Sequence, residues 1–222
     1  MLPFQPALGE IDPVIPVFPL PGAMLLPHGR MPLNIFEPRY LALIEGALGA
    51  GRMFGMIQPD SLKPSSAHGA ATFKVGCLGR ITSFAETEDG RIVLSLLGVI
   101  RFSVIEEVEQ QRGYRRMRVD YAPYIEDLDP PPADIGLPRK ALLAALRSYF
   151  GRQGVDADWE AIGDMDDPTL LTALCMMCPF APSEKQALLE ADKPAQRTQI
   201  LQALLEFGMH GNDPEGGSQR LS

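Results

Sequence analysis

Two cysteines three positions apart, Cys175 and Cys178, are the clearest pair whose types and spacing could support chemistry. A structural zinc site needs four ligands, and the sequence offers one further cysteine, Cys77, and no histidine nearby. A redox-active Cys-x-x-Cys pair opens a helix, where the dipole lowers the thiol pKa, whereas this pair ends a helical run before Pro179. We therefore interpret the cysteines as reduced thiols, and Cys175 and Cys178 as buried or half-buried structural residues.

The three histidines, His28, His68 and His210, show no spacing typical of a nucleophile and its base. We interpret them as surface residues, and keep only His28 as a candidate because of the stretch in which it lies. The phosphate-binding loop Gly-x4-Gly-Lys-Ser/Thr, the zinc motif His-Glu-x-x-His and the nucleophile elbow Gly-x-Ser-x-Gly are all absent. We expect no metal, no cofactor and no catalytic residue, and keep an enzyme with an uncommon site as a hypothesis.

A basic cluster lies between Arg112 and Arg118, with tyrosines among and beside it. Basic residues interleaved with aromatic ones can hold RNA. Alternation along a strand splits the cluster between two faces, so fewer than four arginines can act together. The sequence therefore favours a solvated strand face, and RNA binding through Arg116 and Arg118 is the alternative.

The stretch from Pro16 to Leu48 predicts an extended arm, two short strands and a helix. Pro38 suits the first helical position, because its missing N–H costs nothing there. Apolar residues then recur at helical spacing up to Gly49. Glu37 and Arg39 flank that proline; we expect Glu37 to face the helix N-terminus and Arg39 to pair with an acid of the barrel, with contact to a partner as the alternative.

The middle of the chain shows the alternation of β-strands. We expect a strand at 53–57, a loop at 58–71, a strand from Phe73 toward Phe84, and a turn at Asp89-Gly90. The strand that follows is apolar on both faces and interrupted at Gly98, and another spans 114–121. A long strand bent at a glycine and buried on both sides favours a small barrel.

The segment 126–138 carries four acids and four prolines and is predicted to be a linker between two domains. Beyond it we expect four helices. The first ends at Gly151 and the second begins at Asp167. The third covers 184–190 with a capping box of Ser183 and Gln186, and the fourth runs from Pro194 to 208. Such short capped helices predict a bundle. The predicted organisation is a flexible arm (1–13), a β-barrel domain (14–125), the linker, a helical bundle (139–208) and a disordered tail (209–222).

Charge is distributed unevenly along the chain. Residues 1–125 hold 12 acidic and 12 basic side chains, whereas 126–222 hold 16 acidic and 8 basic ones, which accounts for the whole net charge of −8. An acidic half argues against a nucleic-acid backbone as partner, because phosphate contacts need Lys and Arg. No apolar run approaches the roughly 20 residues that span a bilayer, and no signal peptide is recognisable, so we expect a cytoplasmic protein.

Three blocks of this sequence resemble one known family. FPLPGAMLLPHGRMPLNIFEPRY is similar to the opening of the Lon N-terminal domain, the substrate-recognition module of the Lon protease that is also found inside cereblon. GRITSFAETEDGRIVLSLLGVIRFSV resembles its hairpin, and EKQALLEADKPAQRTQILQALLE its end. The resemblance covers roughly residues 14–207 and implies an α+β fold, a PUA-like β pseudo-barrel followed by an α-helical bundle.

The resemblance also implies a function, namely binding of unfolded or degron-bearing polypeptides, or of protein partners such as protease or chaperone components, in protein quality control. Lon's ATPase and Ser–Lys peptidase have no counterpart in this sequence, so we expect a binding protein that performs no reaction. Flexible methionines suit promiscuous peptide binding, and the same apolar residues could instead be core. The candidate peptide-binding residues are Met24, Leu26, His28, Met31 and Phe54, beside the loop 58–71.

Overall fold

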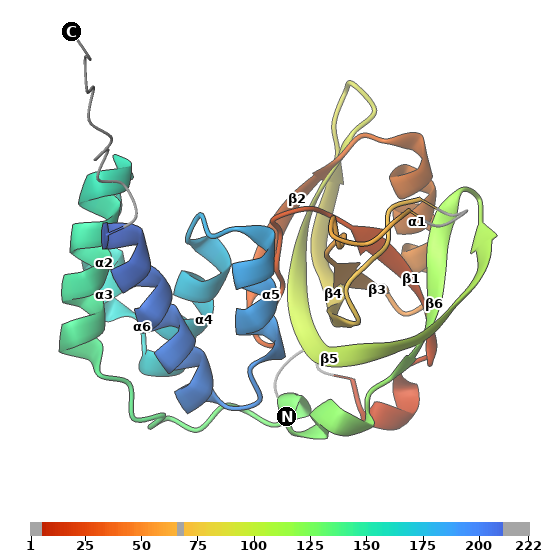
Figure 1. Ribbon diagram of the computed structural model, residues 1–222. Coiled ribbons are helices and arrows are strands. Elements are labelled where there is room, and N and C mark those ends of the chain that lie inside the picture. Colours follow the sequence, from red (N-terminus) through yellow and green to blue (C-terminus); the bar gives the residue numbers. More distant parts are fainter. Residues whose placement is uncertain (1–5, 66–68, 211–222) are drawn as a thin grey trace, which may run out of the picture.

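The computed structural model describes residues 6–65 and 69–210, and for Met209 and His210 the backbone alone. A strongly curved β-sheet lies beside a group of helices (Figure 1). We call residues 14–120 the barrel lobe and residues 139–210 the helical lobe. This arrangement confirms the expected α+β class. Residues 1–5 of the predicted arm, His68, and residues 211–222 of the predicted tail lie outside the described residues.

Six strands form one sheet in the order β2-β5-β4-β3-β1-β6, and β5 also pairs with β6. That second pairing closes five strands into a ring and leaves β2 attached at its side. One strand pair, β1 with β3, is parallel, and the others are antiparallel. The strands are β1 (Val14–Pro19), β2 (Arg30–Ile35), β3 (Met53–Ile57), β4 (Val75–Glu86), β5 (Ile92–Gln111) and β6 (Tyr114–Asp120).

The long strand β5 makes the ring possible, because its first half pairs with β2 and β4 and its second half with β6. At Gly98 the backbone of Leu26 and Pro27 packs directly against β5. A Cβ atom at Gly98 would overlap the carbonyl oxygen of Leu26, so the position accepts only glycine. His28 N–H donates to the Gly98 carbonyl at 2.9 Å, and Gly98 N–H donates to the Gly29 carbonyl at 2.8 Å.

The helix α1 (Pro38–Gly49) begins and ends where the sequence predicts, with proline in its first turn. It buries Tyr40, Leu43 and Ile44 against the ring of strands. The aromatic rings of Tyr40 and Phe18 pack edge to face, with their centroids 4.2 Å apart. The acid that pairs with Arg39 is not on a strand of the barrel but is the neighbouring Glu37: Arg39 Nη2 lies 2.8 Å from Glu37 Oε2, and both side chains are exposed. The Glu37 carboxylate therefore binds its neighbour and makes no capping hydrogen bond.

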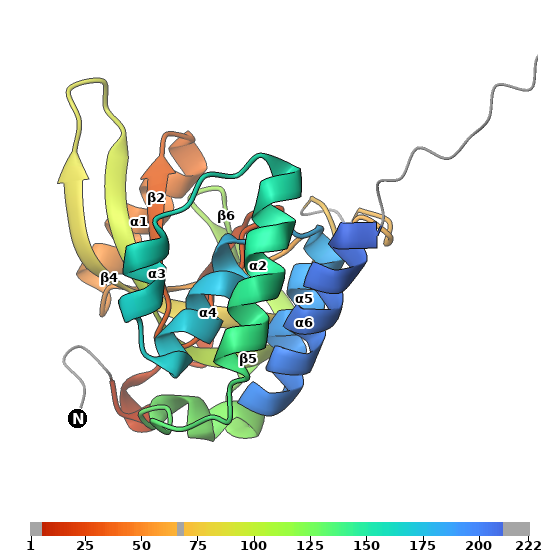
Figure 2. The same cartoon turned by 90° about the vertical axis from the view of Figure 1, so that its left-hand side faces the viewer.

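Five helices make up the helical lobe, which faces the viewer in Figure 2. The short α3 escaped prediction because one turn and a half shows no periodicity, although Asp158 caps it by accepting a hydrogen bond from Ala161 N–H at 3.0 Å. A 3-10 helix, η2 (Ala122–Leu128), leads toward this lobe, and another, η1 (Leu8–Glu10), precedes β1. The helices are α2 (Arg139–Gln153), α3 (Trp159–Asp164), α4 (Asp167–Met177), α5 (Pro182–Glu190) and α6 (Pro194–His210).

Two predicted helix ends need correction. The first helix continues past Gly151 and stops at Gly154, whose φ of +65° ends it in the left-handed conformation. The capping box of Ser183 and Gln186 is wrong, because α5 begins at Pro182 and its Glu184 accepts a hydrogen bond from Ala181 N–H at 2.7 Å. Gln186 instead reaches the barrel lobe, where its Nε2 donates to the Val75 carbonyl at 3.1 Å.

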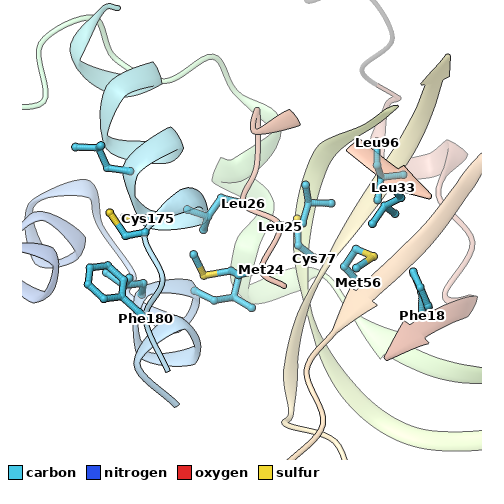
Figure 3. Packing of buried hydrophobic residues seen from close by; sticks show 14 of the residues in the cluster. Phe18, Met24, Leu25, Leu26, Leu33, Met56, Cys77, Leu96, Cys175 and Phe180 are labelled. Atoms are coloured by element: carbon cyan, nitrogen blue, oxygen red, sulfur yellow. The ribbon is translucent and has the colours of Figure 1, made fainter. Parts of the chain in front are cut away.

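One hydrophobic core crosses from the sheet to the helices. The segment between β1 and β2 passes between the lobes, and its side chains alternate: Leu25 points toward Cys77 in the sheet, whereas Met24 and Leu26 point toward the helical lobe (Figure 3). All three cysteines are buried in this core or beside it. Burial raises the pKa of the Cys175 and Cys178 thiols to about 12. No helix in the described ranges is long and apolar enough to cross a membrane.

Candidate functional site

A cleft of about 970 Å³ opens between the barrel lobe and the helical lobe. Its walls come from four stretches that are distant in the sequence and from Arg101 on β5. The stretches are the entry to β2, the 3-10 helix η2 with the proline run behind it, one side of α4, and the start of α6. Binding sites are typically concave and mostly apolar with a few polar groups. The cleft is therefore the candidate site among the residues that the structure describes.

Methionines and prolines form the apolar side of the cleft. Met31 is half-buried on β2, and Met176 and Met177 end α4 opposite it, with 77% of Met177 exposed. The lobes approach closely here, since a Cβ atom at Gly29 would overlap the Met176 sulfur. Unbranched methionine side chains adapt to ligands of different shape. The proline run 130–132 also lines the cleft, and its fixed backbone angles make this segment stiff.

Two of the five predicted peptide-binding residues line this cleft, namely His28 and Met31. His28 has a φ of +64°, a left-handed conformation that turns the chain sharply into β2. Met24, Leu26 and Phe54 are 1% exposed or less and belong to the core. Their side chains offer no surface to a ligand in this structure, because the lobes and the segment between them pack against one another.

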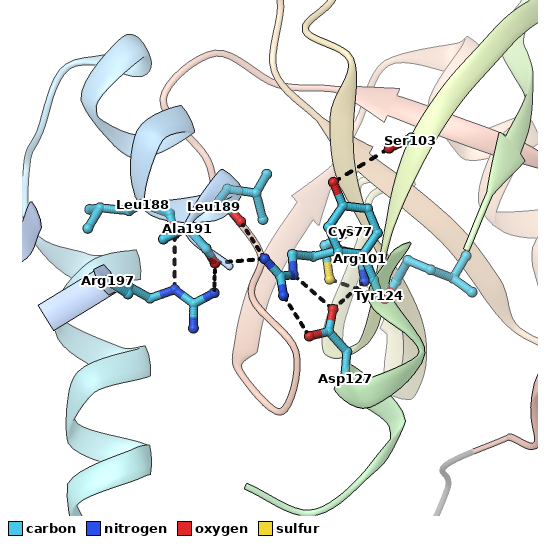
Figure 4. Close-up of polar contacts among 10 residues, drawn as sticks. Cys77, Arg101, Ser103, Tyr124, Asp127, Leu188, Leu189, Ala191 and Arg197 are labelled. Atoms are coloured by element: carbon cyan, nitrogen blue, oxygen red, sulfur yellow. Dashed lines mark hydrogen bonds and ion pairs between the residues drawn. The ribbon is translucent and has the colours of Figure 1, made fainter. Parts of the chain in front are cut away.

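A charged cluster lines the cleft around the buried Arg101, a part that we call the inner end. Figure 4 shows its contacts. Asp127 accepts hydrogen bonds from Arg101 Nε at 2.9 Å, from Arg101 Nη2 at 2.9 Å and from the Arg101 backbone N–H at 3.0 Å. The guanidinium also stacks on Tyr124, 4.7 Å from the ring centre. Nη1 of Arg101 donates to the carbonyls of Leu189 and Ala191 at the end of α5. This one side chain therefore joins sheet, 3-10 helix and helical lobe.

Further hydrogen bonds fix the two lobes to each other. The ammonium group of Lys185 donates to the Gly22 carbonyl at 2.9 Å and to the Met176 carbonyl at 3.1 Å. Gln58 Nε2 donates to the Pro182 carbonyl at 3.0 Å. Burial lowers the pKa of Lys185, because the charged form loses water. These hydrogen bonds end on backbone carbonyls of each lobe, Gly22 on one side and Pro182 on the other, and they therefore hold the two walls of the cleft at a fixed separation.

The predicted basic cluster is largely matched by acids of neighbouring elements. Arg118 Nε lies 2.9 Å from Glu106 on β5, and both side chains are exposed. Arg115 pairs with Glu107 on the same strand at 2.7 Å. These acids lie beside the arginines because β5 and β6 are antiparallel neighbours, and the pairing removes much of the positive potential that RNA would need. Arg116 and Arg118 lie outside the cleft.

A metal site in a protein needs several ligating side chains that converge on one point. Among the residues that the structure describes, no group of three or more His, Cys, Asp or Glu side chains is placed to hold a metal ion. The sequence reasoning missed Met176 and Met177 as candidate site residues, although they stand between the two cysteines that it discussed. The signal was their position: burial of Cys175 and Cys178 turns the two intervening residues outward.

Comparison with known proteins gives a consistent result. The family model described as the substrate-binding domain of the ATP-dependent protease La (LON) matches residues 14–206. Lon protease 2 of Myxococcus xanthus is 27% identical over 111 residues, 50% of this chain and 13% of that protein. The Lon protease of Cytophaga hutchinsonii is 22% identical over 204 residues, 89% of this chain and 24% of that protein. Protein cereblon of Gallus gallus is 25% identical over 113 residues, 50% of this chain and 24% of that protein.

Solved structures agree with the sequence matches. The chain resembles the crystal structure of a Lon N-terminal domain protein from Xanthomonas campestris, with 26% identity and a TM-score of 0.57 over 87% of this chain and 98% of that one. The N-terminal domain of the Mycobacterium avium complex Lon protease gives the same TM-score and coverage at 18% identity, which shows the shared fold alone. The chain thus spans nearly the whole of these domains but a quarter or less of the length of the curated relatives it matches.

Proposed function

Because the chain belongs to the family of Lon substrate-binding domains, we propose that it binds unfolded or degron-bearing polypeptide in the cleft between its lobes and performs no reaction there. The observation that carries this proposal is the apolar, methionine-rich wall formed by Met31, Met176 and Met177 in a cleft of about 970 Å³. A groove of this kind binds extended segments through adaptable apolar contacts, which tolerate many sequences.

The rigid attachment of the lobes supports the same proposal. A preformed cleft needs no ordering of its own residues when a ligand binds, so less free energy is lost on association. The polypeptide, in contrast, must become ordered, and the affinity per unit of interface is correspondingly modest. We propose that the protein acts as an adaptor in cytoplasmic protein quality control and presents captured chains to protease or chaperone components.

A binding experiment with a permanently unfolded chain tests the proposal. Reduced and alkylated α-lactalbumin carrying a fluorescent dye should bind saturably, as measured by anisotropy. Met177→Asp places a charge on the cleft wall without disturbing the core, because this side chain is largely exposed. We expect it to weaken binding at least about tenfold, since a desolvated carboxylate opposes apolar contact.

The matched control is Phe207→Asp, which changes an equally exposed apolar residue on α6 outside the cleft. It should bind the unfolded chain as the parent protein does. Absence of saturable binding, or equal loss in both variants, would contradict the proposed site. Mass spectrometry of the polypeptide after prolonged incubation should show an unchanged chain, whereas a new covalent product would indicate an enzyme with an uncommon site.

A further inference from the structure

Two guanidinium groups converge on one carbonyl at the inner end of the cleft. Arg101 and Arg197 both donate to the Ala191 carbonyl oxygen, at 2.8 and 3.1 Å (Figure 4). The Asp127 carboxylate is engaged by Arg101 through both of its oxygens. Arg197 directs Nε and Nη2 to the neutral carbonyls of Leu188 and Ala191. Among the described residues no carboxylate lies within ion-pair distance of Arg197, and Asp127, which Arg101 engages directly, acts on Arg197 only at longer range.

The surroundings make the lack of a close carboxylate costly in the free protein. The pKa of Arg197 is lowered, first by burial and then by the neighbouring charge of Arg101. Lys193, which stands one turn before Arg197, also lines the cleft. A carboxylate that arrived here would form charge-assisted hydrogen bonds with a guanidinium whose charge is now only weakly compensated. The local chemistry thus fits an anionic group of a ligand.

The two lobes are joined by hydrogen bonds where this charge lies. Arg101 and Leu171 are the buried lining side chains of the cleft, and the hydrogen bonds from Arg101 to Leu189 and Ala191 connect the lobes at that point. A polypeptide that enters between the methionines and prolines cannot continue through this contact. The inner end of the cleft therefore suits the end of a chain better than its middle.

We propose that the cleft recognises the free C-terminus of its polypeptide ligand, with the terminal carboxylate held by Arg197 and the preceding apolar side chains lying against Met176 and Met177. This inference rests on the proposed function, because it assigns the ligand's orientation in the same cleft. The exposed acids at the rim, Glu126, Asp129 and Asp192, repel segments rich in Asp or Glu. A chain end delivers one carboxylate without adding acidic side chains.

Three dye-labelled peptides of one apolar sequence test this orientation on the unaltered protein. The first ends in a free carboxylate, the second in an amide, and the third in an amide with one central aspartate. We expect the free acid to bind at least about tenfold more tightly than either amidated peptide, the loss typical of a removed charged hydrogen-bond partner. Equal binding of acid and amide would overturn the inference and leave the proposed function standing.

The other outcomes are equally decisive. If the central aspartate restores the affinity of the amidated peptide, the site recognises a carboxylate but no chain end, and the inference is overturned. If unfolded α-lactalbumin binds but the free-acid peptide does not, the inference fails alone. If neither ligand binds, the proposed function and the inference fail together.

A variant assigns the effect to its residue. Arg197→Gln should reduce the acid-to-amide affinity ratio to about one, while Arg197→Lys retains part of it because the charge remains. Arg152→Gln, an equal change of charge on the exposed end of α2, is the matched control and should keep the full ratio. The acid-to-amide ratio is measured within each variant. If Arg197→Gln lowers both affinities equally and keeps the ratio, Arg197 supports the fold and does not bind the terminal carboxylate, and the assignment to this residue is refuted.

Discussion

Removal of the Asp127 carboxylate is the sharpest test of how the cleft is held together. In Asp127→Ala the guanidinium of Arg101, whose side chain is 6% exposed, keeps its charge but loses its only ion-pair partner in the described part of the chain. Breaking a buried ion pair in this way costs about 3–5 kcal/mol, because an uncompensated charge stays buried. The hydrogen bonds of Arg101 to Leu189 and Ala191 persist and retain part of its stabilisation, so we expect about 3 kcal/mol.

The assay is urea unfolding followed by the fluorescence of Trp159, the single tryptophan, and by circular dichroism. A loss of about 3 kcal/mol corresponds to a fall in Tm of about 6–12 °C for a protein of this size. The double variant Arg101→Met with Asp127→Ala should recover part of the loss, since it removes the unpaired charge as well. The exposed pair of Arg118 and Glu106 is the control, and Glu106→Ala should cost less than about 1 kcal/mol.

Two results would refute this reasoning. A cost below about 1 kcal/mol for Asp127→Ala would mean that Arg101 finds water or another partner and is not held by the carboxylate. A double variant less stable than Asp127→Ala would mean that the backbone carbonyls at the end of α5 depend on the arginine more than the arginine depends on its acid.

Three further predictions follow from the packing. Gly98→Ala should lower the free energy of unfolding by at least about 1–3 kcal/mol in urea titrations, because the backbone beside it leaves no space for a methyl group. In the folded protein, the thiols of Cys175 and Cys178 should react with a thiol reagent at pH 8 only as fast as the protein unfolds. Their pKa of about 12 also means that stability falls as the pH rises from the ordinary thiol pKa toward 12, since the unfolded chain ionises first. The double variant Arg116→Ala with Arg118→Ala should bind unfolded α-lactalbumin unchanged, and a loss comparable to that of Met177→Asp would place the binding surface on β6.

Local signals were sufficient at the two ends of α1 and at the bend of β5, but not at the ends of α2 and α5. Pro38 and Gly49 bound α1 because a proline fits a first helical turn and a glycine ends a helix. Gly98 marked the place where the long strand meets other backbone, although the partner, Leu26, could not be known. Alternation marked β6 and parts of β4 and β5, whereas β1 lay in the predicted extended arm and β3 is buried on both faces.

The site depended on information that the sequence does not carry in one place. Met31, Met176 and Arg197 come from three elements, and only the docking of the lobes brings them to one cleft. The same docking buries Met24 and Leu26, which look like surplus apolar residues when the barrel is considered without the helices. Their burial therefore follows from contacts between distant segments, which periodicity within a segment does not report.

The shared core limits how this protein can be divided. A fragment that ends before α2 would expose the side chains of Met24 and Leu26 to water as part of a continuous hydrophobic surface. Such a surface promotes self-association and unspecific adhesion. Truncated forms would consequently adhere to unfolded chains for a trivial reason, and point substitutions in the intact protein are the cleaner instrument for mapping its ligands.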